Sequence, residues 1–163
     1  MIKLRNAEKT DFETIVKLNQ EEVEKTSPMD MSRLELLDGM ACYHKVVEVN
    51  GQAAGFLFAM DETADYQNDN FAFFKSRYER FVYVDRIVIA AEFAGKKLGS
   101  ALYDDLFSYA RSQQINTMTC EFYTQPLNVV SQQFHQRFGF QEVGSQLAED
   151  GIKVVSLQAA EVE

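Results

Sequence analysis

Cysteine, histidine and proline are all scarce in this chain of 163 residues, where each occurs twice. Cys42 and Cys120 cannot form a disulfide framework, and no CxxC or HxxxH pair has metal-ligand spacing, so we expect no metal site. No apolar run approaches the ~20 residues that a membrane-spanning helix needs. The first residues, MIKLRNAEKTD, lack the apolar segment of a signal peptide. We therefore expect a cytoplasmic protein.

Basic residues are outnumbered, because 16 Lys and Arg face 25 Asp and Glu for a net charge of −9. This balance argues against binding to nucleic acids and to anionic membranes, which both demand a basic surface. It is compatible with a cationic substrate such as an amine, although most net charge serves solubility. The chain is 46% hydrophobic and 25% charged, as is ordinary for one globular domain, so we expect a single domain over residues 1–163.

Apolar periodicity predicts an α/β (α+β) fold with helices on both faces of a mixed, mostly antiparallel sheet of about seven strands. Asn50-Gly51 is a strong signal for a two-residue hairpin. The strand–helix–strand order in the C-terminal half predicts parallel crossovers. Residues 61–80 show no clear period. The expected strands cover 2–6, 43–49, 52–60, 81–90, 115–123, 140–143 and 152–157, and the expected helices cover about 10–23, 32–40, 98–110 and 127–138.

A buried strand at 81–90 leads into a loop with two glycines and two lysines, and an amphipathic helix follows at once. Free N–H groups and the positive dipole end at a helix start form an anion site, and glycines let the backbone approach a phosphate closely. The alternative is a connecting loop with two solvated lysines. The next helix has a second polar feature: Asn128, Ser131 and His135 share one stripe beside its apolar face. The alternative for His135 is a packed residue without a catalytic role.

Together these two segments resemble the GNAT superfamily of acyl-CoA-dependent N-acetyltransferases, and the element order matches over nearly the whole chain. The family's motif A, commonly written [RQ]xxGx[GA], falls on residues 94–99, AGKKLG. Its motif B is an Asn before a helix that ends in an aromatic residue and Gly-Phe. That motif falls on Asn128, Phe134-His135 and Gly139-Phe140. The resemblance implies a GNAT-like fold and acetyl-CoA as the cosubstrate.

The resemblance also implies the site residues. In the family, N–H groups of the motif A loop hold the CoA pyrophosphate, the preceding strand pairs with the pantetheine arm, and the motif B Asn contacts the pantetheine. His135 occupies a position where the family often has a Tyr that acts as general acid near the CoA sulfur. The implied cofactor-binding residues are Ile87, Val88, Ile89, Gly95, Lys96, Lys97, Leu98, Gly99, Ser100, Asn128, Ser131 and Phe134.

Three positions depart from the family pattern. Ala94 replaces the usual Arg or Gln, which removes a side-chain contact but not the backbone site. Lys97 replaces a Gly, so its position must accommodate a Cβ atom. His135 replaces Tyr, which changes the pH behaviour of any acid step because histidine titrates near ~6.5 and tyrosine near ~10.

Acetyl transfer needs a deprotonated amine, whereas alkylamines are mostly protonated at neutral pH. Asp85 and Glu121, on neighbouring strands, are the catalytic candidates for the base, and as a pair they could also hold an ammonium group. The alternative for either is a strand-end charge that reaches solvent or pairs with Arg86. An acyl-cysteine at Cys120 has little support because no histidine neighbour is evident.

Residues 61–80 carry five aromatic side chains that could wall a substrate pocket, form a subunit interface or pack as a satellite core. They are Tyr66, Phe71, Phe73, Phe74 and Tyr78.

The sequence therefore predicts an N-acetyltransferase that moves an acetyl group directly from acetyl-CoA to a primary amine of a small molecule or peptide. Backbone N–H groups would polarise the thioester carbonyl. The rival interpretations are a non-catalytic acyl-CoA-binding or sensor module and, with least support, a structural subunit without a CoA site. The acceptor stays open, and so does the oligomeric state, with a homodimer among the alternatives because the family often dimerises.

Overall fold

A seven-stranded sheet is the centre of the computed structural model, which describes residues 1–22, 26–125, 127–148 and 150–163. In chain order the elements are β1 (Ile2–Asn6), α1 (Phe12–Glu21), α2 (Met31–Met40), β2 (Tyr43–Val49), β3 (Gln52–Asp61), α3 (Asp69–Lys75), β4 (Val82–Ile89), α4 (Leu98–Ser112), β5 (Thr117–Gln125), α5 (Val129–Arg137), β6 (Gln141–Leu147) and β7 (Val154–Glu161), with short 3-10 helices at Lys9–Asp11 and Ala91–Phe93. The strand order is β1-β2-β3-β4-β5-β7-β6. All neighbouring pairs are antiparallel except β4 and β5. The predicted fold class is confirmed.

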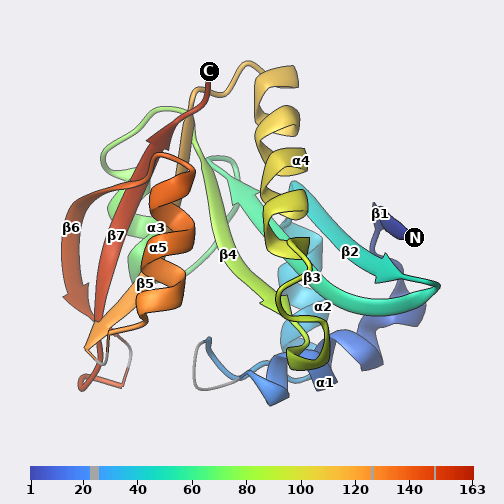
Figure 1. Ribbon diagram of the computed structural model, residues 1–163. Coiled ribbons are helices and arrows are strands. Elements are labelled where there is room, and N and C mark those ends of the chain that lie inside the picture. The colour runs from blue at the N-terminus through green and yellow to red at the C-terminus, as the bar shows by residue number, and fades with distance from the viewer. Residues whose placement is uncertain (23–25, 126, 149) are drawn as a thin grey trace.

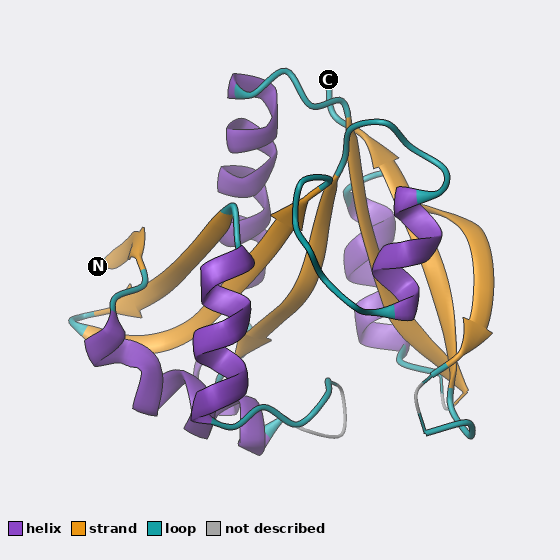
Figure 2. Ribbon diagram, turned by 180° about the vertical axis from the view of Figure 1, so that it is seen from behind, coloured by secondary structure: helices purple, strands orange, loops and turns teal. Residues whose placement is uncertain are grey.

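Helices cover both faces of this sheet. Figures 1 and 2 show α4 and α5 on one face and α1, α2 and α3 on the other. Each face has its own apolar core, one containing Ile15, Leu34 and Phe74, and the other Leu102 and Leu106. Within the described residues, no helix is long and apolar enough to cross a membrane.

The predicted hairpin at Asn50-Gly51 is confirmed. Val49 pairs with Gln52 across the turn. Asn50 has φ 51° and Gly51 has φ 83°, the left-handed backbone that a two-residue turn of this kind requires. The hairpin therefore sets the register of β2 and β3 near the turn.

The segment 61–80, for which no period was evident, contains α3. The side chain of Asn68 accepts hydrogen bonds from the N–H groups of Asn70 and Phe71, which starts this seven-residue helix. Phe71 and Phe74 are buried in the core, and a helix of two turns is too short to show a clear sequence period. The aromatic residues of this segment thus pack mainly as core.

Other boundaries also differ from prediction. β6 and β7 extend beyond the predicted 140–143 and 152–157, since their alternation of apolar and polar residues is weak. α1 ends at Glu21, and the expected continuation to Val23 lies outside the described residues. The crossover from β4 to β5 through α4 is parallel, as predicted. β6 does not pair with β5, because β7 lies between them.

Candidate active site

A cavity of about 1100 Å³ lies where β4 and β5 separate, and it is lined from both faces of the sheet. The parallel ladder between these strands contains only the pairs Val82–Met118 and Tyr83–Thr119. β4 also has an irregularity in its pairing with β3, where Phe58 pairs with Arg86 and Ala59 with Val84, so that Asp85 is the extra residue of a bulge. The cavity is lined by Gly99, Tyr103, Ser131, Phe134 and His135 on one face, by Arg33, Tyr66 and Asn70 on the other, and by Asp85, Ile87, Ile89, Cys120 and Glu121 between them.

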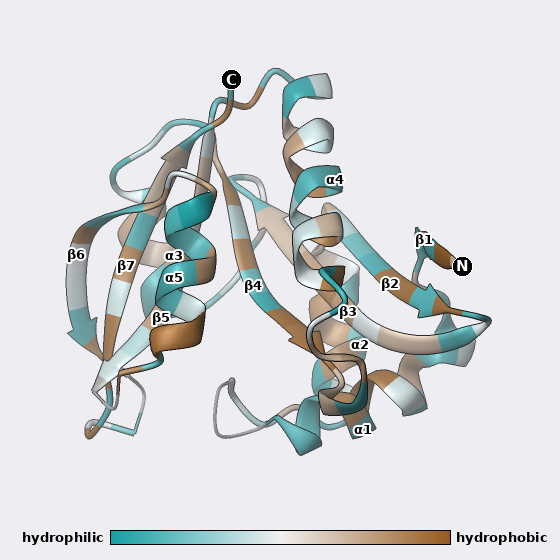
Figure 3. Ribbon diagram, in the orientation of Figure 1, coloured by the Kyte–Doolittle hydropathy of each residue, from teal (hydrophilic) through white to brown (hydrophobic). Residues whose placement is uncertain are grey.

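Asp85 is buried and already paired. Its carboxylate accepts hydrogen bonds from Arg86 Nε at 2.7 Å and from the Tyr66 hydroxyl at 2.5 Å. Arg86 is in turn held by Ser27, whose backbone oxygen and Oγ each lie 2.9 Å from the guanidinium, and by Asn19. Figure 3 shows a hydrophilic stretch within β4, followed by a hydrophobic one. The pairing with Arg86 was the alternative considered for this residue.

Glu121 lies on β5 and lines the cavity, and none of the described residues forms an ion pair with it. Its Oε1 accepts a hydrogen bond of 2.7 Å from the Tyr83 hydroxyl. Its Oε2 is buried and makes no hydrogen bond of ordinary geometry with the described residues. Burial raises the pKa of Glu121 to about 8, and Asp85 adds to the shift, while Tyr83, Asn70 and Arg86 oppose it. A carboxyl group that titrates near neutral pH is suited to general-base chemistry.

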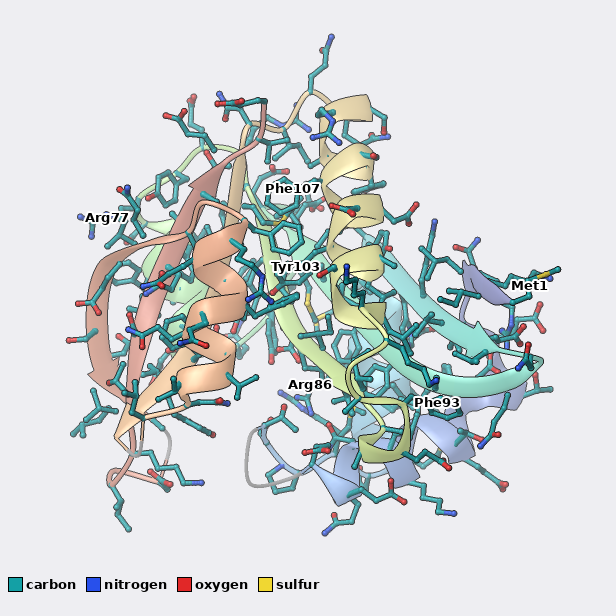
Figure 4. The ribbon with its side chains drawn as sticks, viewed as in Figure 1. Met1, Arg77, Arg86, Phe93, Tyr103 and Phe107 are labelled. Carbon is teal, nitrogen blue, oxygen red and sulfur yellow. The ribbon has the colours of Figure 1, made fainter. Side chains whose placement is uncertain are left out.

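His135 lies on α5 with both ring nitrogens occupied. Nδ1 lies 2.7 Å from the backbone oxygen of Ser131, which only accepts hydrogen bonds, so Nδ1 carries the proton. Nε2 is then the acceptor for the Tyr103 hydroxyl at 2.7 Å. Burial lowers the pKa of His135, so the ring is neutral at pH 7. Figure 4 shows Tyr103 projecting from α4 toward α5.

Cys120 also borders the cavity, and its side chain is buried. Burial raises the pKa of Cys120 well above its ordinary value, which keeps the sulfur protonated. The buried hydroxyl of Tyr103 is its polar neighbour. Nothing here activates a covalent acyl-cysteine.

The motif A loop lies at the start of α4. The N–H groups from Gly95 to Ser100 donate no hydrogen bond to another described residue, so they are available to an anion. Gly95 has φ 82°, which favours glycine. Lys97 adopts a left-handed conformation, φ 61° and ψ 27°, so the chain tolerates a Cβ atom at this position only with some backbone strain. The side chains of Lys96 and Lys97 are exposed, and that of Leu98 is buried in the core.

Gly99 is the point of this loop that reaches the cavity. A Cβ atom there would lie 3.4 Å from the Phe134 ring and 3.9 Å from Ile87 Cδ1. The start of α4, the middle of α5 and the C-terminal half of β4 therefore converge at Gly99. Ile87 and Ile89 line the cavity as well, whereas the side chain of Val88 is buried in the core on the other face.

The motif B residues are also at the cavity. Asn128 is the N-cap of α5, where its Oδ1 accepts a hydrogen bond of 3.1 Å from the Ser131 N–H group. Ser131 Oγ is 3.2 Å from His135 Nδ1. The Phe134 ring packs on Tyr103 with a centroid distance of 5.0 Å. The structure thus brings both predicted motifs and both predicted acids to one place.

Sequence reasoning missed Tyr83, Tyr103 and Arg33. Two of them had a recognisable signal: Tyr103 follows Gly99 by one helical turn, and Tyr83 precedes Asp85 by two residues on a strand. Arg33 had none, because α2 is distant in sequence from both motifs. Among the described residues, no group of three or more His, Cys, Asp or Glu side chains could hold a metal ion.

Known proteins share this architecture. The family described as acetyltransferase (GNAT) matches residues 3–140. No curated protein is significantly similar in sequence. Three solved structures illustrate the shared fold. The ribosomal-protein-S18-alanine N-acetyltransferase from Escherichia coli has a TM-score of 0.75 and 15% identity, covering 100% of this chain and 95% of that one.

An acetyltransferase of the GNAT family from Streptococcus pneumoniae has a TM-score of 0.74 and 20% identity, with both chains covered completely, 100% and 100%. The spermidine N-acetyltransferase from Vibrio cholerae, solved with CoA and spermine, has a TM-score of 0.73 and 17% identity, covering 99% of this chain and 95% of that one. These likenesses concern the fold, whereas the family match spans most of the sequence. This chain belongs to the acetyltransferase (GNAT) family.

Proposed function

We propose that this protein transfers the acetyl group of acetyl-CoA directly to a primary amine. The observation that carries the proposal is a cavity lined from both faces of the sheet, in which the carboxyl group of Glu121 forms no ion pair with a described residue. The motif A loop marks the donor side, where α4 and α5 lie. The acceptor would approach from the face of α1, α2 and α3 and meet the donor between β4 and β5.

The donor side is suited to CoA. The free N–H groups from Gly95 to Ser100 and the dipole of α4 favour a pyrophosphate, and Lys96 and Lys97 add positive charge. The ladder between β4 and β5 ends at Tyr83, so the edge of β4 that faces β5 is not paired with that strand from there to Ile89. The backbone groups on this edge can therefore form hydrogen bonds with an extended pantetheine arm. The CoA bound in the Vibrio cholerae spermidine N-acetyltransferase supports this assignment for a chain of the same fold.

Glu121 is the better base of the two predicted acids. Asp85 is neutralised by Arg86, whereas Glu121 has a free Oε2 and a pKa near the pH at which an amine must lose its proton. Glu121 would take one proton from the ammonium group. The nitrogen then attacks the thioester carbon, the C–S bond breaks, and the second nitrogen proton passes to the departing thiolate, so that the amide and the CoA thiol are the products. Backbone N–H groups of β4 would stabilise the carbonyl oxygen during this step.

In this scheme His135 is a positioning residue for the Tyr103 hydroxyl and does not transfer a proton. A neutral ring that donates to Ser131 and accepts from Tyr103 has no proton to give to the thiolate, while it holds the Tyr103 hydroxyl in place. The general-acid role implied by the family resemblance stays a prediction, which a variant series can test.

Thiol release from acetyl-CoA with a broad panel of amines tests the proposal. Gly99→Asp should abolish both turnover and the rise in melting temperature with CoA, because a carboxylate would crowd and repel the pyrophosphate. Binding to the folded state alone stabilises it by about 2.7 kcal/mol at a ligand concentration 100-fold above Kd. A sensor module would show the melting shift but no thiol release with any amine. A structural subunit would show neither, and the proposal would be wrong.

A further inference from the structure

We propose that the acceptor is a small amine that also carries a carboxylate, as amino acids do, and that Arg33 binds this carboxylate. The inference rests on the proposed function and names the substrate class of the same site. Arg33 lies on α2 and lines the cavity from the face opposite α4 and α5. It is therefore on the acceptor side, separated by the sheet from the motif A loop.

The guanidinium group of Arg33 has no carboxylate partner among the described residues. Its Cζ lies 5.7 Å from the centre of the Tyr66 ring. Arg5, Arg80 and Arg86, in contrast, each form an ion pair with an acidic side chain. A guanidinium group that borders a cavity and lacks a partner can bind a carboxylate with two parallel hydrogen bonds.

A continuous set of contacts joins Arg33 to the proposed base. Arg33 lies over Tyr66, the rings of Tyr66 and Tyr83 are 6.3 Å apart, and the Tyr83 hydroxyl bonds Glu121 at 2.7 Å. Two tyrosine rings in contact thus separate the cation from the base. In this arrangement the acceptor would place its carboxylate at Arg33 and direct its amine along the two rings toward Glu121.

The charges around the acceptor end favour the same class. Asp85 is compensated by Arg86, and Glu121 is largely protonated at pH 7 because burial raises its pKa to about 8. Lys153 offsets the exposed Asp150 at another part of the lining. Among the described lining residues on this side, Arg33 is left as a charge without an ionic partner, so an acceptor with several positive charges would be repelled. The overall charge of −9 is thus a poor guide to the charge inside the cavity.

The first experiment compares amino acids with their amides, which keep the α-amine and the side chain but lose the negative charge. Purified protein with acetyl-CoA would be assayed for thiol release with L-leucine, L-methionine and L-phenylalanine and with their three amides. We expect kcat/KM for the acids to exceed that for the amides at least tenfold. Equal or higher values for the amides overturn the proposal and leave the acetyltransferase function standing.

Variants of Arg33 separate carboxylate binding from structural support. Arg33→Gln should raise KM for the amino acids at least tenfold and leave the amides unchanged, and Arg33→Lys should retain part of the preference. Arg77→Gln is the matched control, because that guanidinium also lies over a ring, 4.9 Å from the centre of Phe73, at residues that do not line the cavity. If Arg33→Gln slows both series equally, Arg33 only supports Tyr66, and the proposal is wrong.

Product binding makes the test independent of turnover. Calorimetry on the CoA-loaded protein would compare N-acetyl-L-leucine with N-acetyl-L-leucinamide, and we expect the acid to bind at least tenfold more tightly, with the difference lost in Arg33→Gln. If this difference exists but no acceptor is acetylated, the transfer reaction is wrong and the carboxylate site at Arg33 stands. If the two compounds bind equally, the carboxylate site is wrong even in an active enzyme.

Discussion

The Tyr103 hydroxyl donates a hydrogen bond of 2.7 Å to His135 Nε2, and this contact joins α4 to α5 across the candidate active site. Both side chains are almost fully buried, with 0% of Tyr103 and 5% of His135 exposed. His135 Nδ1 in turn donates to the Ser131 backbone oxygen. The pair therefore connects the helix that follows the motif A loop with the helix of motif B.

His135→Ala should lower stability more than catalysis. Removing the ring leaves the buried Tyr103 hydroxyl without its acceptor, which costs about 1–3 kcal/mol. Tyr103→Phe should cost a similar amount, and the double variant less than the sum, because both partners of one hydrogen bond are then absent. Urea unfolding measures the three free energies. A kcat that falls more than 100-fold per folded molecule in His135→Ala but is intact in Tyr103→Phe would instead show that His135 is the general acid.

Glu121→Gln should lower kcat/KM for the amine by about 10²–10⁴, the usual contribution of a general base. The rate of the unaltered protein should rise with pH up to about 8, the pKa of Glu121, and the variant should lack this limb. Glu142→Gln is the matched control, since that carboxylate on β6 also accepts a hydroxyl hydrogen bond, from Ser156 at 2.7 Å. A variant at position 121 with full activity and an unchanged pH profile would exclude Glu121 as the base.

The same substitution should stabilise the protein at alkaline pH. The folded protein holds the Glu121 proton up to a pKa of about 8, whereas the ordinary value is 4.5, so the folded state binds more protons between these values. Stability from this group is fully present below pH 4.5 and decreases as the pH rises through 8. Glu121→Gln should thus increase the free energy of unfolding at pH 9 by about 5 kcal/mol, for a pKa raised from 4.5 to about 8 at roughly 1.4 kcal/mol per pKa unit, with little change at pH 4. Equal effects of the substitution at both pH values would contradict the buried, raised-pKa carboxyl.

Lys97→Gly should raise the melting temperature. Lys97 has φ 61°, and glycine adopts this conformation without strain, so we expect a net gain of about 0.5–1 kcal/mol after the larger chain entropy of glycine in the unfolded state is counted. CoA affinity, measured by calorimetry, should fall less than tenfold because one charge is lost and the N–H groups remain. Lys96→Gly provides the comparison, because Lys96 lacks a positive φ. A lower melting temperature for Lys97→Gly than for Lys96→Gly would show that the left-handed residue is not strained.

Local pattern determined most of the elements and predicted the proposed donor side of the site. The Asn50-Gly51 turn, the apolar stripe of α4 and the motifs at 94–99 and 128–140 depend on residues close in the chain. Such short-range features can be predicted from sequence because turn geometry and helical period depend on only a few neighbouring residues. α3 was missed because its seven residues are too few to show a period.

Only the tertiary structure decided which residues line the proposed acceptor side. The partners of Arg86 at Ser27 lie 59 residues away in sequence, and the bulge at Asp85 depends on the pairing of β4 with β3. The raised pKa of Glu121 follows from burial between strands that separate, and the placement of Arg33 opposite the motif A loop follows from how α2 packs on the sheet. The sequence by itself predicted which residues would bind CoA, because backbone N–H groups and a helix start are local features. The charge that an acceptor would meet depends on which ionic groups compensate one another, and that is decided by contacts between residues distant in the chain.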